Sequence, residues 1–215
     1  MEDLDYEVLH PNVYYFPSPF DDIEKLVDTI EEVNSEAITP WDTWYAGNTD
    51  DTHPYGDIKV LRREKLDLET EPETKEKALY VLNDLAKTME KCCTVYMKEH
   101  GVDTEEELDY LNKNLYEPRQ VFGLRRYNET EAMGPHRDGS SEQSDNYTIA
   151  VYFDSDYEGG EISIVEEGVN VAVKPNKGSI VIFPSDYLHE SRPLTKGRKT
   201  MITHVHRTIN KWIEL

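Results

Sequence analysis

Hydrophobic residues recur at helical spacing in two segments of the first hundred residues. In residues 16–36, which carry a Ser-Pro pair and two aspartates near their start, one face is apolar: Phe20, Ile23, Val27, Ile30 and Val33. In residues 73–101 the same spacing runs over a longer stretch that Gly101 ends: Ala78, Leu82, Leu85, Met89, Cys92 and Tyr96. Both patterns predict an amphipathic helix.

A third, shorter helix is predicted in the acidic residues 103–114, with Asp103 or Thr104 as the N-cap. Residues 41–69 are aromatic and irregular, with one predicted strand at 58–61. His53 lies in this region, where it fits either a lid over a substrate or an ordinary surface position.

From about residue 119 the pattern changes to short runs of β-branched and aromatic residues. Clusters of glycine, proline, asparagine and aspartate separate six such runs: 119–127, 147–154, 160–167, 169–175, 178–184 and 198–206. Short strands at regular spacing predict a sandwich or a small barrel. We therefore expect one α+β domain over 1–215, in which 1–118 supply mainly helical support and substrate-side loops and 119–215 form the β core.

The net charge of −21 limits the classes of partner. A nucleic-acid backbone or an anionic membrane surface requires clustered Lys and Arg, so we expect neither nucleic acid nor membrane as a partner. The two cysteines, Cys92 and Cys93, are adjacent and cannot readily bridge each other. With no secretory signal and no long apolar run, we expect a reduced, cytoplasmic setting. The oligomeric state is not encoded in any pattern found here.

The triplet His136-Arg137-Asp138 is the first candidate for chemistry. A His-x-Asp triplet occurs often by chance, but this one lies between two predicted strands, and His189 follows 51 positions later after another strand. Two imidazoles and one carboxylate suit a divalent iron site that keeps three positions open. The alternative is a cupin-like site in which His189 combines with His204 and His206, which share one strand face.

Further motifs follow the triplet in a fixed order. "LRRY" precedes the loop with "HRD", and "YTIAVYFD" leads to "EGGEISI", where Gly159 and Gly160 predict a tight turn with positive φ. "VKPNKGSIVIFPSDYLHESRPLTKGRKT" holds Pro-x-x-Gly, an apolar strand, the second histidine and a basic pair. Together, residues 127–206 resemble the iron(II)/2-oxoglutarate-dependent dioxygenases, particularly their prolyl 4-hydroxylase-like branch.

The resemblance implies a double-stranded β-helix (jelly-roll) core with supporting N-terminal helices. It also implies a facial triad of His136, Asp138 and His189 that holds Fe(II), with 2-oxoglutarate and O2 as cosubstrates and ascorbate as a candidate reductant. The expected reaction is hydroxylation of a C–H bond, with release of succinate and CO2.

The resemblance further implies a basic residue that binds the distal carboxylate of 2-oxoglutarate. Arg198 and Lys199 both lie at a suitable distance after His189. We expect Arg198, because on a strand it shares its side with Thr200, whose hydroxyl can support the carboxylate, and because a guanidinium pairs bidentately with carboxylates. Tyr152 and Tyr127 match tyrosines that line the same pocket in the family.

The substrate is a peptide, a protein or a small molecule. The prolyl hydroxylase branch favours a peptidyl proline, and a free amino acid or another protein side chain stays open as an alternative. A non-catalytic jelly-roll module that has lost its iron is the competing class, and the intact set of candidate ligands argues against it. Residues 37–72 and 139–147 are the candidate substrate-contacting segments and match no known motif.

Overall fold

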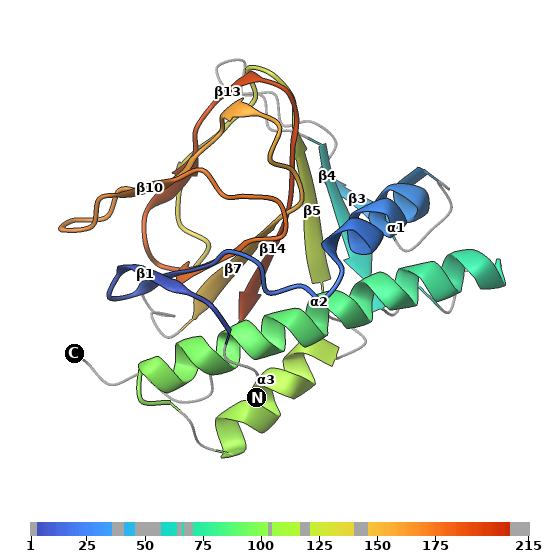
Figure 1. Ribbon diagram of the computed structural model, residues 1–215, viewed down its shortest axis with the longest axis horizontal. Coiled ribbons are helices and arrows are strands. Elements are labelled where there is room, and N and C mark those ends of the chain that lie inside the picture. The colour runs from blue at the N-terminus through green and yellow to red at the C-terminus, as the bar shows by residue number, and fades with distance from the viewer. Residues whose placement is uncertain are drawn as a thin grey trace.

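The computed structural model describes residues 4–35, 41–45, 57–63, 66, 71–102, 105–116, 121–139 and 146–206 (Figure 1). These residues form three helices: α1 (Ile23–Ser35), α2 (Pro72–Glu99) and α3 (Glu105–Tyr116). The strands before the predicted β core are β1 (Glu7–His10), β2 (Val13–Phe16), β3 (Trp41–Tyr45) and β4 (Asp57–Arg62). The strands within it are β5 (Val121–Tyr127), β6 (Met133–His136), β7 (Tyr147–Tyr152), β8 (Glu158–Gly159), β9 (Ile162–Ile164), β10 (Val171–Val173), β11 (Ile180–Pro184), β12 (His189–Ser191), β13 (Leu194–Lys196) and β14 (Lys199–His206).

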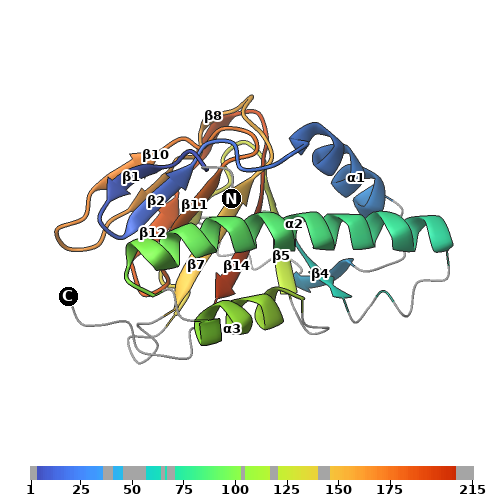
Figure 2. The same ribbon diagram turned by 60° about the horizontal axis from the view of Figure 1, so that its bottom comes forward.

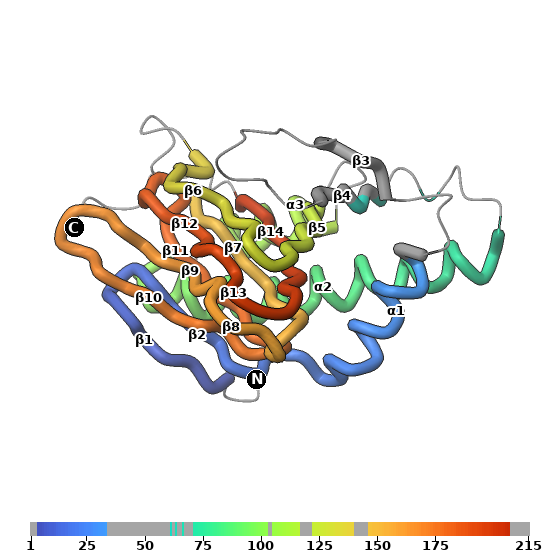
Figure 3. The backbone as a smooth tube through the Cα atoms, turned by 90° about the horizontal axis from the view of Figure 1, so that it is seen from above, coloured from blue at the N-terminus to red at the C-terminus, as the bar shows by residue number. Residues whose placement is uncertain are grey.

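Two antiparallel sheets form the β core. The large sheet has the order β1-β2-β11-β7-β14-β5-β4-β3, and the small sheet has the order β10-β9-β12-β6. Seen from above, the small sheet lies over the β2, β11 and β7 part of the large one (Figure 3). A cluster of buried side chains from both sheets, including Tyr152, Ile164, Phe183 and Met201, fills the space between them. The sandwich predicted from the strand pattern is therefore present, within an α+β architecture.

The helices cover the outer face of the large sheet. α2 runs across the strands of the large sheet, and α3 lies beside α2, as Figure 2 shows. Strands β7 and β11 are consequently buried on both faces: Ile149 and Ile182 face the helices, whereas Ala150 and Phe183 face the inside of the sandwich. This two-sided burial explains why both strands are continuous apolar runs rather than alternating ones.

Helix α2 is the longest element and carries the predicted apolar face. Pro72 opens it, and its C-terminus closes with the Gly101 amide donating to the Lys98 carbonyl at 2.9 Å and the Val102 amide to the Met97 carbonyl at 2.8 Å. Gly101 has a φ of 72°, the left-handed conformation that suits a helix end. The apolar face buries residues from Ala78 to Met97. Both cysteines on this face are free and buried.

The N-terminal part contributes more strand than the sequence predicted. Strands β1 to β4 all belong to the large sheet, so this part of the chain extends the sheet in addition to supplying helices. Short strands such as β1 and β2 escaped notice because four residues are too few to show a period. The predicted strand at 58–61 lies within β4. The first helix begins at Ile23, later than its pattern suggested. His53 and the proposed caps Asp103 and Thr104 lie outside the described residues.

The Gly159-Gly160 turn has the predicted conformation. Both residues have positive φ, at 71° and 69°. A Cβ on Gly159 would lie 2.5 Å from the Pro193 carbonyl oxygen, so the close approach of β8 to β13 requires glycine there. Among the described helices, none is both long and apolar enough to span a bilayer.

Candidate metal centre

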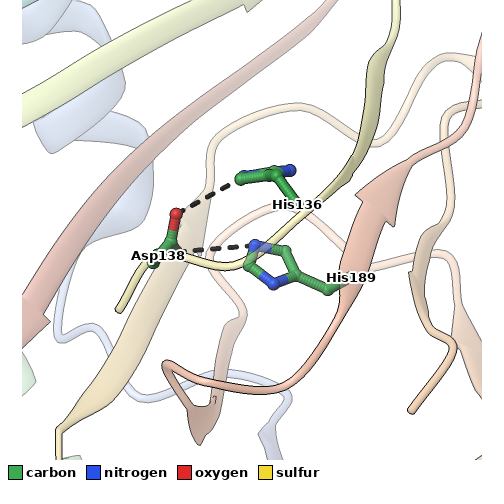
Figure 4. A group of neighbouring side chains, drawn as sticks. All are labelled: His136, Asp138 and His189. Carbon is green, nitrogen blue, oxygen red and sulfur yellow. Dashed lines mark ion pairs between the residues drawn. The ribbon is translucent and has the colours of Figure 1, made fainter. Parts of the chain in front are cut away.

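Three potential metal ligands converge where β6, the loop after it and β12 meet. The Nε2 atoms of His136 and His189 each lie 3.4 Å from a carboxylate oxygen of Asp138. One ligand atom from each residue lies within 4.8 Å of the other two, and Figure 4 shows the three side chains directed toward one another. Pairing of β12 with β6, in which His189 is opposite His136, brings the two imidazoles together.

Backbone carbonyls fix the orientation of both imidazoles. Nδ1 of His136 lies 2.8 Å from the Gly134 carbonyl oxygen, and Nδ1 of His189 lies 2.9 Å from the Tyr187 carbonyl oxygen. Because a carbonyl only accepts, each Nδ1 carries the proton and each Nε2 presents its lone pair to the centre. This is the tautomer that metal binding through Nε2 requires. These acceptors leave no trace in the sequence, since any residue supplies a carbonyl.

The backbone of the segment before His189 holds Asp138 in place. The amides of Asp138 and Gly139 both donate to the Ser185 carbonyl, at 2.9 and 3.0 Å. A Cβ on Gly139 would lie 2.6 Å from the Ser185 Oγ, so glycine permits this close approach. The loop that carries Asp138 is therefore fastened to the segment that carries the second histidine.

Arg137, the middle residue of the triplet, also connects the loop after β6 to the segment before His189. Its guanidinium pairs with Glu166 and also donates to the Asp186 carbonyl. The Leu188 amide donates to Glu166 at 2.9 Å. The hydrogen bond from Arg137, followed by that from Leu188, lowers the pKa of Glu166 to about 2. Arg137 thus ties the loop to the segment before β12 and does not point at the centre.

Asp138 is ionised at neutral pH. Its burial acts to raise the pKa, but the close contacts with the His136 and His189 rings outweigh that effect and hold the pKa of the carboxyl well below its usual range. The centre therefore presents one carboxylate and two imidazole nitrogens. Such a mixed set suits a divalent transition metal and leaves positions open for further ligands.

Thr148 on β7 supports the carboxylate, and its removal should weaken metal binding. Its Oγ1 donates to the Asp138 Oδ2 at 2.8 Å. Because partners that orient a ligand typically contribute about 10- to 100-fold in affinity, Thr148→Val should raise the Mn(II) dissociation constant by that factor. Thr148→Ser, which keeps the hydroxyl, should restore most of the affinity. Equal Mn(II) affinities in Thr148→Val and the wild type, measured by titration calorimetry, would refute this role.

The three residues line a cavity between the two sheets. Its walls are largely aromatic or apolar, among them Tyr127, Tyr152, Ile162, Phe183 and Met201. Phe183 packs edge-on against the His189 ring at a centroid distance of 4.7 Å. The centre thus lies at the side of a cavity that combines aromatic and apolar walls with a few polar groups, as expected of a small-molecule site.

Comparison with known proteins shows what the β core is similar to. Residues 122–214 match the family model of the 2OG-Fe(II) oxygenase superfamily. The match spans the strands of the β core, from β5 to β14, and shows that this part of the chain is similar to that superfamily. The matched residues contain both histidines and the aspartate described above. The superfamily is the one that the sequence motifs resemble, so that prediction is confirmed.

One relative in sequence is named as a hydroxylase. A PKHD-type hydroxylase of Idiomarina loihiensis is 32% identical over 126 residues, which cover 53% of this chain and 58% of the relative. The chain thus aligns with little more than half of that relative's length.

Solved structures share the fold. The 2OG-Fe(II) oxygenase-family oxidoreductase of Burkholderia pseudomallei has a TM-score of 0.56 at 17% identity and covers 96% of this chain and 91% of its own. A prolyl hydroxylase of Trichoplax adhaerens, solved with a hypoxia-inducible-factor peptide, has a TM-score of 0.53 at 11% identity and covers 94% of this chain and 85% of its own. The likeness supports the predicted jelly-roll fold for the oxygenase core.

Two buried tyrosines face the cavity. Tyr152 is 1% exposed, and its hydroxyl has no hydrogen-bond partner among the described residues. Tyr127 is also 1% exposed and lines the same wall. Burial raises the pKa of both phenols, so both keep their protons. A buried hydroxyl without a partner costs free energy, which a ligand oxygen placed there would recover.

Lys199 is fully buried beside this wall. Its ammonium donates to the Gly160 carbonyl at 2.7 Å and to the Ser191 hydroxyl, and it lies 4.9 Å from the centre of the Tyr127 ring. Ser191 and Tyr127 themselves line the cavity. The Gly159-Gly160 turn therefore supplies the carbonyl that fixes the Lys199 side chain.

Arg198, which immediately precedes β14, and Thr200 on that strand are directed away from the cavity, contrary to the expectation for Arg198. The Arg198 guanidinium is 47% exposed and lies 3.6 Å from Glu31 on α1. Thr200 is buried, but it does not line the cavity, whereas Met201 and Thr203, on the same side as Lys199, do. The alternation along the strand was predicted correctly, but the side that faces the cavity was assigned wrongly.

His204 and His206 face the helices rather than the cavity, which corrects the three-histidine alternative. They alternate with the cavity residue Thr203 on β14, and His206 packs against Tyr147 at a centroid distance of 4.8 Å. Burial lowers the pKa of His206 to about 3, so the ring is uncharged. Among the described residues, the set of His136, Asp138 and His189 is the one group able to hold a metal ion.

Proposed function

We propose that the protein is an Fe(II)- and 2-oxoglutarate-dependent dioxygenase that hydroxylates a C–H bond. The observation that carries the proposal is the convergence of His136, Asp138 and His189 at a cavity inside a domain of the 2OG-Fe(II) oxygenase superfamily. The overall change consumes 2-oxoglutarate, O2 and a substrate C–H bond and yields succinate, CO2 and the alcohol. Iron, when bound, supplies the activation of O2 that drives this oxidation.

The chain's own residues supply position and a dry environment. His136, Asp138 and His189 would hold the metal on one face, with Thr148 and the two carbonyl acceptors keeping these ligands in orientation. The aromatic walls limit water around the centre, and this protects an oxidising reaction from side reactions.

The cosubstrate would lie between the metal and Lys199. Its distal carboxylate would pair with the Lys199 ammonium and accept from the unpartnered Tyr152 hydroxyl. This assignment replaces Arg198 and Thr200, which lie on the opposite side of the strand. Tyr127, which contacts Lys199 and lines the cavity, would complete the same wall.

The substrate that the comparisons favour is a peptidyl proline. The Trichoplax protein with a similar fold is a prolyl hydroxylase bound to a peptide fragment. The Idiomarina protein with a similar sequence is named a PKHD-type hydroxylase. We propose a peptide or protein substrate on this basis. A free amino acid or a different protein side chain is the alternative. The cytoplasmic location expected from the sequence also stays a proposal.

Binding of 2-oxoglutarate should depend on pH through Lys199. Burial lowers the pKa of this lysine to about 7. Only the ammonium form pairs with a carboxylate, so above pH 7 each binding event must take up a proton. The dissociation constant should therefore rise by about tenfold per pH unit above pH 7 and level off below it.

The measurement is calorimetry of 2-oxoglutarate binding to the Mn(II)-loaded protein between pH 6.5 and 9. Lys199→Arg is the matched control, because a guanidinium keeps its charge over this range and the dependence should disappear. A wild-type affinity that stays constant from pH 7 to 9 would contradict the assignment of Lys199.

Succinate formation tests the proposed function. Purified protein supplied with Fe(II), 2-oxoglutarate, ascorbate and O2 should form succinate even without substrate, and a proline-containing peptide mixture should gain the mass of one oxygen atom. Both signals should disappear in His136→Ala. A wild-type protein that forms no succinate, although it holds iron and binds 2-oxoglutarate, would refute the function.

A further inference from the structure

Arg125 is a cation inside the cavity that the proposed reaction does not use. It lies on β5 two residues before Tyr127, so the two side chains share one face of the strand, and both line the cavity with the three metal ligands. Arg126 points the other way and pairs with Glu31. The neighbouring arginines of "LRRY" thus have different surroundings, one inside the cavity and one outside it.

Arg125 has no acidic partner among the described residues. No carboxylate of that part of the chain lies within 4.0 Å of its guanidinium, and its buried Nε has no acceptor. Its neighbour is the neutral Tyr127 phenol. Glu190, a second carboxylate on the cavity wall, is turned to Arg192 at 3.6 Å. Arg125 is half-buried, so its guanidinium is only partly hydrated, and a ligand that supplies a counter-charge there gains binding energy.

The charges of the loaded site leave Arg125 unbalanced. This step rests on the proposed function. Fe(II) and the Lys199 ammonium carry three positive charges, and Asp138 with the two carboxylates of 2-oxoglutarate carries three negative ones. The histidines are neutral as ligands. Arg125 then adds one uncompensated positive charge beside the centre, so the remaining ligand of the cavity should bring one negative charge.

We propose that Arg125 selects a substrate that carries a carboxylate close to the carbon to be hydroxylated. A guanidinium pairs with a carboxylate through two parallel hydrogen bonds, which orients the substrate as well as attracting it. Two sources offer this group. One is an acidic side chain next to the target residue of a peptide, and the other is the terminal carboxylate of a peptide or a free amino acid.

Matched pairs of probes separate the two sources. The first pairs are blocked pentapeptides with a central proline flanked on either side by Asp or by Asn. The second pair is a blocked tripeptide that ends in proline with a free carboxylate or with an amide, and the third is free proline with prolinamide. Binding is measured on the Mn(II)- and 2-oxoglutarate-loaded protein, where no turnover occurs, and hydroxylation is then followed by mass on the Fe(II) form.

We expect the acid of at least one pair to bind about tenfold or more tightly than its amide, as for a charge-assisted pair. In Arg125→Gln this ratio should fall to within about twofold of unity. Arg126→Gln, the matched control outside the cavity, should keep the wild-type ratio. The pair that discriminates identifies the source of the carboxylate.

Three results would overturn the inference. One is that no acid binds more tightly than its amide, and the second is that Arg125→Gln keeps the ratio. The third is that Arg125→Gln weakens 2-oxoglutarate binding and leaves the ratio unchanged, which would assign Arg125 to the cosubstrate. Failure of the proposed function looks different, since the wild type would then form no succinate. Succinate formation without discrimination refutes the role of Arg125 alone.

Discussion

Lys199→Met should weaken 2-oxoglutarate binding by at least about 30-fold, because removing one partner of a buried charge pair costs roughly 2 kcal/mol or more. Lys199 is fully buried and lies against two residues of the cavity wall, Ser191 and Tyr127. Methionine has a similar volume, and the removal of a desolvated amine offsets the lost hydrogen bonds. The melting temperature should therefore change by only a few degrees.

The matched control is Arg198→Met, at the residue immediately before Lys199 and the start of β14. The Arg198 side chain is 47% exposed and directed to Glu31, so the affinity for 2-oxoglutarate should stay within about twofold of the wild type. Calorimetry on the Mn(II)-loaded variants gives both values. If Arg198→Met loses the affinity and Lys199→Met keeps it, the assignment of the strand faces is wrong.

Asp138→Asn should abolish metal binding at concentrations that saturate the wild type. The amide keeps the shape of the side chain but removes the negative charge between the two imidazoles. Binding to the folded state alone stabilises a protein by about 2.7 kcal/mol when the ligand stands at 100 times its dissociation constant. Excess Mn(II) should therefore raise the wild-type melting temperature by about 5 to 10 °C and leave that of Asp138→Asn unchanged.

Asp156→Asn is the control for this experiment, because Asp156 is exposed and lies outside the cavity. It should show the full rise in melting temperature with Mn(II). An equal rise in Asp138→Asn and the wild type would mean that the metal binds elsewhere.

The metal ligands could be predicted from the sequence because their signals are local. His136 and Asp138 lie two residues apart, and His189 follows a continuous apolar strand. Strands β5, β7, β11 and β14 were predicted for the same reason, because each is long enough or apolar enough for its residue pattern to indicate a strand. The short strands β6 and β12, which carry the histidines, have no such pattern and are defined by their pairing within the small sheet.

The choice between Arg198 and Lys199 shows where sequence reasoning failed. A one-residue change in phase reverses both faces of a strand, and the residue-type argument for a guanidinium favoured the wrong face. A better signal was available in Met201, an apolar residue that had to be buried inside the sandwich and that shares its side with Lys199. Arg125 could have been found in the same way, because it shares its side with Tyr127.

Other parts of the site have no sequence signal at all. The carbonyls of Gly134 and Tyr187 orient the imidazoles through backbone atoms that every residue possesses. Thr148 on β7 donates to Asp138, which lies ten residues earlier on the loop after β6, so this contact depends on the tertiary structure. These contacts could be identified only once the two sheets were in place.

Anomalous diffraction from crystals grown with Mn(II) and 2-oxoglutarate would locate the metal and the cosubstrate directly. We expect one strong anomalous peak bonded to His136 Nε2, Asp138 and His189 Nε2. We also expect density for 2-oxoglutarate that joins this metal to the Lys199 ammonium and the Tyr152 hydroxyl. A metal bound away from these three side chains, or a distal carboxylate bound to Arg198, would contradict this assignment.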